Sequence, residues 1–170
     1  MNDALCEHIV ARKSKPMDFI IRILIIVVIV AVAIVGMPFL GFFAFALAAI
    51  LALLAYYFAF PLLNVEYEYS LLNHDLDIDA IYSKEKRKPK MNLDIQNAEI
   101  IAPKGSHRLD SYHPEATCDF SSGNANAKVF AIMIPINQKM TCVYIEPDEK
   151  IIEHMKQCCL LYTSPSPRDS

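Results

Sequence analysis

The sequence has 170 residues, of which 54% are hydrophobic, and a formal net charge of −3 at pH 7. The mild negative charge gives no global basic field, so composition argues against nucleic acid as a partner. The five cysteines show no paired spacing, which argues against a secreted disulfide framework and against a typical zinc site.

Residues 1–16 mix apolar and charged side chains. Leu5, Ile9 and Val10 are separated by polar or charged residues, which favours a brief amphipathic helix along the inner membrane surface. A frayed terminus explains so short a segment equally well. Both interpretations stay open at this point.

A long apolar run follows. Residues 23–65 are 43 consecutive residues without Asp, Glu, Lys, Arg or His. As one helix they would measure about 65 Å at about 1.5 Å per residue, whereas a hydrocarbon core is only about 30 Å thick. We therefore expect a two-helix transmembrane hairpin over residues 17–63. Its helices should cover roughly 18–35 and 39–60, with the break at Gly36-Met37-Pro38.

The distribution of cations predicts the orientation of this hairpin. Arg12, Lys13 and Lys15 precede the first helix, and a basic cluster at residues 84–90 follows the second, whereas the turn between them has no charge. Because Lys and Arg accumulate on the cytoplasmic side, we expect a multi-pass plasma membrane protein with both termini in the cytoplasm. The apolar run is too long for a signal peptide, so we expect it to stay uncleaved.

Two features inside the helices have alternative interpretations. Arg22 can snorkel to the headgroups, or it can mark an intramembrane ion or lipid site; the lack of an acidic residue at bilayer depth favours snorkelling. Small residues in the second helix either let the helices approach closely or simply face lipid. These are Ala44, Ala46, Ala48, Ala49, Ala52 and Ala55.

Residues 64–158 read as a β-rich domain. Residues 65–71 and 76–82 alternate between apolar and polar positions around a turn at Asn73-His74-Asp75, which predicts a β-hairpin. Ile151, Ile152 and Met155 share one face of a predicted helix over residues 148–157. Further strands or strand-like segments are expected at 91–95, 98–102, 117–121, 128–134 and 140–145, with a loop at 103–114.

The predicted fold class is a membrane α-helical hairpin followed by a small antiparallel β, or α+β, cytoplasmic domain. Short strands without helical crossovers favour a meander or a small barrel. A terminal helix that closes such a barrel is the pleckstrin-homology-like plan, and we take it as the expected architecture.

Several motifs carry a resemblance to a known family. Glu66-Tyr67-Glu68-Tyr69, the segment Leu76 to Ile81 and Lys86-Arg87-Lys88 resemble a family of small bacterial proteins with two transmembrane helices and a cytoplasmic domain of unknown function. The start at Glu7-His8-Ile9-Val10 fits the same pattern, and the resemblance covers residues 5–157. The strand motif also resembles bacterial pleckstrin-homology-like membrane domains. The resemblance implies a membrane location and supplies no activity.

The basic cluster is the main candidate site, because each Lys or Arg near an anionic membrane surface can contribute about 1 kcal/mol to binding. Its cations are expected to contact anionic lipid headgroups from the tip of a loop. An ordinary solvated loop that only satisfies the orientation bias is the alternative. The candidate residues are Lys84, Lys86, Arg87, Lys88 and Lys90.

Two acidic or histidine-containing groups are weaker candidates. Asp75, Asp77 and Asp79 share one face of a strand, where a solvated surface is favoured over a cation site because the ligand pattern of a calcium loop is absent. His107, His113 and Cys118 match no established zinc spacing. We therefore expect no metal and no cofactor.

No nucleophile with a base partner and no phosphate-binding glycine loop is visible, so we expect no enzymatic activity. The favoured function is an integral membrane protein that anchors a small cytoplasmic β-rich binding or scaffold module. Its partners would be the lipid bilayer, with anionic headgroups or another membrane protein. The alternative is a non-catalytic subunit of a larger membrane complex, contacted through the helical hairpin.

Residues 159–170 change abruptly to a Ser- and Pro-rich composition. They resemble the translation of a transposon-type sequencing adapter and are therefore excluded from the fold prediction. A genuine disordered tail is the alternative.

Overall fold

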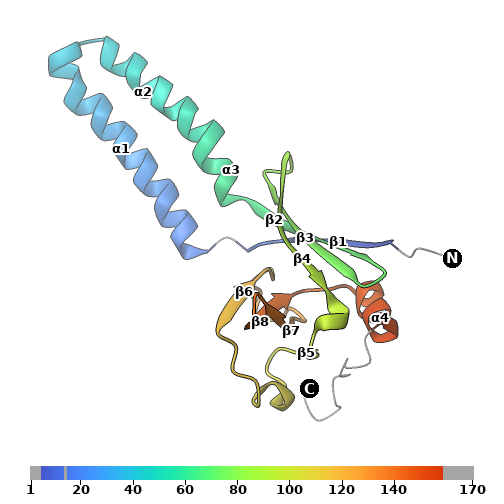
Figure 1. Cartoon of the computed structure of the whole chain (residues 1–170). Coiled ribbons are helices and arrows are strands. Elements are labelled where there is room, and N and C mark those ends of the chain that lie inside the picture. Colours follow the sequence, from blue (N-terminus) through green and yellow to red (C-terminus); the bar gives the residue numbers. More distant parts are fainter. Residues whose placement is uncertain (1–4, 14, 159–170) are drawn as a thin grey trace. The chain divides into compact units, whose positions relative to one another are not determined.

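The structure is a computed structural model that describes residues 5–13 and 15–158 (Figure 1). The adapter-like residues 159–170 lie outside the described part. Internal contacts divide the chain into two units. A helical unit contains residues 13–65 and 82–86, and a sheet unit contains the described parts of 1–12, 66–81 and 87–170.

The helical unit is an antiparallel pair. The first helix, α1, spans Pro16–Leu40; the second combines α2 (Phe43–Leu54), a π-helical segment η1 (Ala55–Ala59) and α3 (Phe60–Leu63). Both are long and apolar enough to span a membrane by length and composition. Pro16 begins α1, where its fixed φ suits the first turn, and the Asp18 carboxylate accepts a hydrogen bond from the Lys15 N–H at 3.0 Å.

The predicted break at residues 36–38 is wrong. Helix α1 continues through Pro38 to Leu40, and the chain reverses at Gly41 and Phe42. Gly41 adopts φ +57°, which glycine tolerates best, and its N–H donates to the Met37 carbonyl at 2.9 Å. Pro38 lies inside the last turns of α1 and has no N–H, so the helix continues there with one backbone hydrogen bond fewer.

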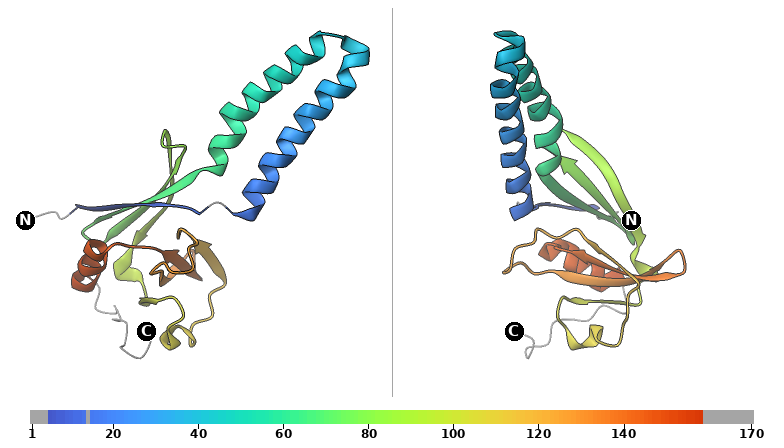
Figure 2. Two further views of the ribbon diagram at one scale, coloured as in Figure 1. Left: turned by 180° about the vertical axis from the view of Figure 1, so that it is seen from behind. Right: turned by 90° about the vertical axis from the view of Figure 1, so that its left-hand side faces the viewer.

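Gly36 instead serves the packing of the two helices, which run side by side in both views of Figure 2. A Cβ at Gly36 would lie 3.1 Å from the Ala44 Cβ, and Ala44 is completely buried. Small residues at this crossing therefore allow close approach. Of the other alanines considered, Ala48 and Ala55 are half-buried, whereas Ala46, Ala49 and Ala52 are exposed.

The first sheet has the strand order β1-β2-β3-β4. Its strands are β1 (Leu5–Ala11), β2 (Val65–Leu72), β3 (Asp75–Tyr82) and β4 (Lys86–Asp94). The hairpin of β2 and β3 confirms the prediction from alternation, and Asn73 at φ +56° makes its turn.

Strand β1 corrects both interpretations of the N-terminal segment. It pairs antiparallel with β2, from Leu5 opposite Leu72 to Ala11 opposite Glu66. Cys6 and His8 are half-buried and Val10 is buried, whereas the residues between them are exposed. The segment is therefore a period-2 strand whose backbone hydrogen bonds come from β2.

The basic cluster is also placed differently from the prediction. The turn after β3 covers Ser83, Lys84 and Glu85, and Lys86 already begins β4. Most of the expected loop is therefore strand. Pro89 fits there because β4 is an edge strand of its sheet, where one side needs no ladder donor.

The second sheet has the order β5-β7-β8-β6. Strands β7 and β8 form an antiparallel hairpin whose turn residues Asn137 and Gln138 have φ of 50° and 66°, as in a type I′ turn. Strand β6 pairs parallel with β8, so the sheet is mixed rather than wholly antiparallel. The elements are η2 (Ile95–Asn97), β5 (Ile100–Pro103), η3 (His107–Leu109), β6 (Ala116–Asp119), β7 (Phe130–Ile136), β8 (Lys139–Ile145) and α4 (Glu149–Cys158).

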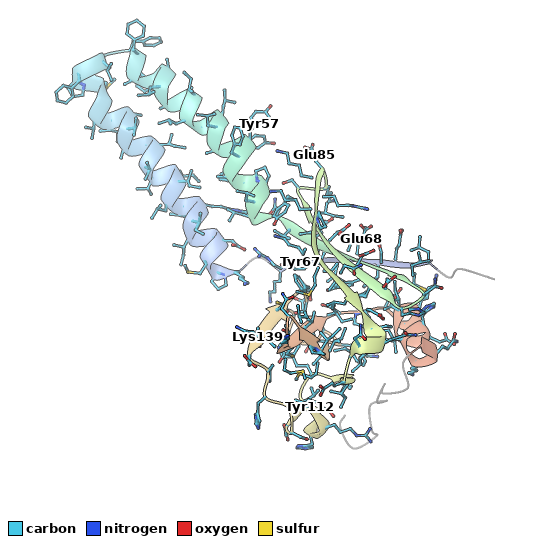
Figure 3. The ribbon with its side chains drawn as sticks, viewed as in Figure 1. Tyr57, Tyr67, Glu68, Glu85, Tyr112 and Lys139 are labelled. Atoms are coloured by element: carbon cyan, nitrogen blue, oxygen red, sulfur yellow. The ribbon has the colours of Figure 1, made fainter. Side chains whose placement is uncertain are left out.

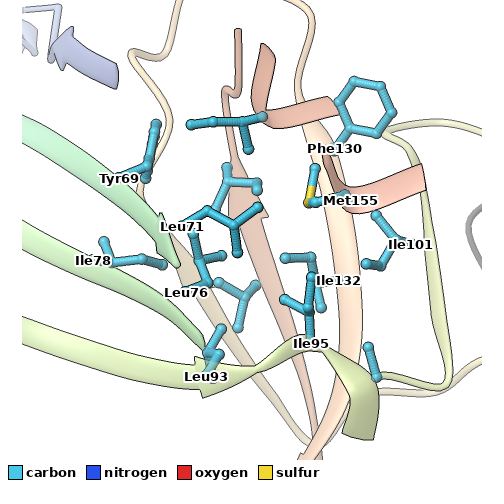
Figure 4. Close-up of a cluster of buried hydrophobic side chains, with 14 of the residues drawn as sticks. Tyr69, Leu71, Leu76, Ile78, Leu93, Ile95, Ile101, Phe130, Ile132 and Met155 are labelled. Atoms are coloured by element: carbon cyan, nitrogen blue, oxygen red, sulfur yellow. The ribbon is translucent and has the colours of Figure 1, made fainter. Parts of the chain in front are cut away.

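The main core lies between residues of both sheets and α4 (Figure 4). Ile151 and Met155 of α4 are completely buried in it, as the predicted helix face requires. The Ile151 N–H donates to Asp148 Oδ1 at 2.9 Å, which caps this helix. The predicted class of a helical hairpin followed by a mainly antiparallel sheet domain is confirmed, but the strands form two separate sheets and no closed barrel among the described residues.

Tyr69 connects the two sheets through its hydroxyl group. This group donates to the Phe120 carbonyl and accepts from the Glu146 N–H at 3.3 Å. Phe120 follows β6 and Glu146 follows β8, whereas Tyr69 is on β2. Burial raises the pKa of the Tyr69 phenol well above its ordinary value.

Candidate membrane-contact site

Asn64 is the centre of a polar junction inside the helical unit. Its side-chain Oδ1 accepts a hydrogen bond from Arg22 Nη2 at 2.8 Å, and its carbonyl accepts one from the Ser83 N–H at 3.0 Å. Asn64 therefore links α1, the end of α3 and the β3–β4 turn. Sequence reasoning missed this junction because Arg22 and Asn64 are 42 positions apart.

The first residue of β4 brings a cation beside an apolar part of the second helix. Lys86 and five residues of α2 and η1 line a hollow of about 450 Å³. The five are Ile50, Leu53, Leu54, Tyr57 and Phe58. Figure 3 labels Tyr57 and also Glu85, which precedes Lys86 in the chain. The lining combines an apolar wall with one ammonium group, a pairing that suits an amphiphile.

The π-helical segment η1 forms part of this wall. It covers Ala55–Ala59 and includes Tyr57 and Phe58. Irregular π segments are uncommon and occur often at functional sites, because they change the direction in which side chains project. Tyr56 and Tyr57 also fit the aromatic belt expected at a membrane interface.

The remaining basic residues belong to the sheet unit. Arg87 Nη2 lies 2.5 Å from Glu68 Oε2, and its Nε lies 3.9 Å from Asp79 Oδ2. Glu68 is only 5% exposed, so Arg87 compensates a buried carboxylate. Lys88 and Lys90 are exposed on the same strand. The five predicted contact residues therefore divide into Lys84 and Lys86 in the helical unit and Arg87, Lys88 and Lys90 in the sheet unit, where Arg87 pairs with acidic residues.

The acidic strand residues show ordinary surface contacts. Asp77 accepts a hydrogen bond from Asn92 at 2.5 Å, and Asp79 faces Arg87. His107 lies 3.4 Å from Asp110 in the loop after β5. Within residues 5–13 and 15–158 no group of three His, Cys, Asp or Glu residues is arranged to hold a metal ion.

Comparison with protein families identifies one family whose model covers both the helical hairpin and the sheets. A family model described as a bacterial PH-like domain, DUF6106, matches residues 2–160. The chain belongs to this family. The match covers the apolar helices as well as both sheets, so the predicted resemblance to a bacterial pleckstrin-homology-like family is confirmed. No curated protein and no solved structure matched the chain.

Membership of DUF6106 establishes a PH-like domain of unknown function. The family therefore assigns no catalytic or binding residue to this chain. The two sheets followed by helix α4 are consistent with a PH-like domain. The chemistry of the domain has to be inferred from its own side chains.

Proposed function

We propose that this DUF6106 protein is an integral protein of the bacterial plasma membrane. Its helical hairpin anchors the PH-like domain as a binding or scaffold module on the cytoplasmic side, and the protein is not an enzyme. Lys84 and Lys86 contact anionic lipid headgroups at the inner surface.

The surface of the hairpin supports membrane insertion. Phe39, Phe42 and Phe43 keep 85%, 84% and 76% of their surface exposed. Large aliphatic side chains continue this surface along both helices. Continuous apolar patches of this extent are rare on soluble proteins, and a bilayer is the solvent that suits them.

The hollow beside Lys86 is the observation that carries the lipid contact. It places an ammonium group next to Tyr57 and Phe58, at the end of the second helix that leads into the sheet unit. An anionic phospholipid offers the complementary pair of groups, an acyl chain for the apolar wall and a phosphate for the cation. Each such cation can add about 1 kcal/mol to the interaction.

Fluorescence quenching in vesicles tests this contact. The full chain would carry a fluorophore at Glu85→Cys, in a background without the native cysteines, and would be reconstituted with brominated phosphatidylglycerol or brominated phosphatidylcholine. We expect stronger quenching by the anionic lipid and a smaller difference at high salt, because screening acts over about 8 Å at physiological ionic strength.

Two variants make the test specific. Replacing Lys84 and Lys86 with Gln should remove the preference for anionic lipid, whereas Lys139→Gln, at the start of β8 in the sheet unit, should leave it unchanged. Equal quenching by both lipids in the unsubstituted chain would overturn the contact. Crosslinking of a chain from which the PH-like domain is deleted tests the alternative function. If partner proteins still crosslink to the helical hairpin of that chain, the protein is instead a subunit of a larger membrane complex.

A further inference from the structure

A second hollow lies wholly within the sheet unit, so it is independent of the membrane contact. Its volume is about 730 Å³, within the usual range for small-molecule sites. Residues at the end of β5, the segment between β6 and β7, and α4 line it. They include Lys104, Lys128, Lys156, Asp119, Phe130 and Ile152.

The charges around this hollow are mainly positive. Three lysines line it, Lys104, Lys128 and Lys156, against the single carboxylate of Asp119. Asp119 Oδ1 accepts hydrogen bonds from the N–H and the hydroxyl of Ser121, at 2.9 and 2.6 Å. The carboxylate is thus engaged with its own chain. This excess of cations stands out in a protein whose formal net charge is −3.

The rim of the hollow is held in place by its own hydrogen bonds. The Ser122 N–H donates to Glu146 Oε2 at 3.0 Å, and the Asn124 N–H donates to Ser122 Oγ at 3.3 Å. The Lys104 N–H donates to the Val129 carbonyl at 2.8 Å, and its ammonium group lies 4.6 Å from the centre of the Tyr144 ring. The contact with Tyr144 holds the Lys104 ammonium group, which therefore loses less freedom when a ligand binds.

Apolar side chains complete the lining. Phe130 is 4% exposed, and Ile152 of α4 is half-buried against the main core. Both line the hollow together with Val129 and Pro103. A ligand for such a surface needs an anionic group for the lysines and an apolar body for these side chains.

We propose that this hollow binds a small organic anion, a phosphate or carboxylate attached to an apolar body. The three lysines hold the anionic group, and Phe130 and Ile152 contact the body. The group can come from a soluble molecule or from a lipid headgroup, since both present the same phosphate chemistry.

Calorimetric titration with naphthyl phosphate tests the site on the full chain in phosphatidylcholine nanodiscs. We expect saturable binding, with naphthol and inorganic phosphate each binding at least about tenfold more weakly, a difference that corresponds to about 1.4 kcal/mol. Replacing Lys128 and Lys156 with Gln should weaken binding of naphthyl phosphate about tenfold or more. Replacing the exposed Lys139 and Lys150, which do not line the hollow, should not.

The possible outcomes separate the alternatives. Weaker binding of the probe in nanodiscs that contain phosphatidylglycerol would identify a headgroup as the source, and unchanged binding would identify a soluble ligand. No binding of naphthyl phosphate, or equal affinity in the Lys128/Lys156 variant and the unsubstituted chain, would overturn the proposal. Binding only of an acidic peptide would also overturn it.

Discussion

Glu68 and Tyr69 are neighbours on β2 that face opposite sides of their sheet, and both are buried. Tyr69 points into the core and bonds to backbone groups beyond β6 and β8, whereas Glu68 pairs with Arg87 of β4. Each has partners far away in the sequence. Tyr69 therefore joins the two sheets, and Glu68 holds the edge strand β4 through Arg87.

Replacing Tyr69 with Phe removes a hydroxyl group that serves two backbone groups. We expect the free energy of unfolding to fall by about 1–3 kcal/mol, since a buried donor and acceptor lose their partner. Urea unfolding of the full chain in detergent micelles, followed by circular dichroism, measures this. Tyr112→Phe, in the half-buried loop after η3, is the matched control and should change stability less; an equal loss in both variants would contradict this role for Tyr69.

The same phenol makes the domain sensitive to alkali. Because burial raises the pKa of Tyr69 in the folded state, the unfolded chain loses this proton first, above about pH 10. The contribution to stability is complete below that pH and is lost as pH rises further. Between about pH 9 and pH 11, the unsubstituted chain should therefore lose more stability than the Tyr69→Phe variant; equal losses would show that other groups control alkaline unfolding.

Replacing Arg87 with Gln leaves the Glu68 carboxylate without its cation. Arg87 is 58% exposed, so solvent screens part of the effect, and we expect a loss of only about 1 kcal/mol. A second change, Glu68→Gln, should restore part of it by removing the buried charge. The same urea titration checks this, and a loss no larger than that of the exposed Lys150→Gln would show that the pair adds nothing.

At the scale of elements, the crossing of α1 and α2 depends on Gly36 and Ala44. Gly36→Leu would force a side chain into a space where a single Cβ already lies 3.1 Å from the Ala44 Cβ. Overpacking of this kind costs about 1–3 kcal/mol. We expect a lower melting temperature in detergent, measured on the helical signal, whereas Ala46→Leu on the exposed side should have little effect. Equal melting temperatures would contradict the close contact.

The elements also show what local sequence patterns can predict. The β2–β3 hairpin, the β7–β8 hairpin and α4 follow from alternation, turn residues and helical periodicity over short distances. Strand β1 does not, because seven residues carry too weak a period and its partner β2 begins more than fifty residues later. The turn of the helical hairpin was misplaced because Gly36 and Gly41 are both plausible breaks, and only packing against Ala44 distinguishes them.

The candidate site was predicted in part. The basic residues were found from their charge alone, which cannot show that Arg87 pairs with a buried glutamate in β2. The hollow between Lys104, Lys128 and Lys156 was missed altogether. Its lysines come from three segments that the fold brings together, and no spacing in the sequence signals them.

At the scale of the whole molecule, the two units share the chain in an interleaved way. The helical unit includes the turn that connects β3 and β4 of the first sheet. Asn64 forms hydrogen bonds with that turn and with α1. The sheet unit takes β1 from before the helices. We therefore predict that a helical hairpin placed between the first two strands of a PH-like sheet, if it spans a membrane, leaves both of its ends on one side of that membrane.

Cysteine labelling in right-side-out membrane vesicles tests this central claim most directly. Phe42→Cys lies in the turn between α1 and α2, and Lys139→Cys lies at the start of β8 in the PH-like domain. Each would be made in a chain whose native cysteines are replaced by alanine. We predict that a membrane-impermeant maleimide labels Phe42→Cys at once and Lys139→Cys only after the vesicles are opened. Labelling of Lys139→Cys in sealed vesicles, or protection of Phe42→Cys before and after opening, would contradict a cytoplasmic PH-like domain anchored by a two-helix membrane hairpin.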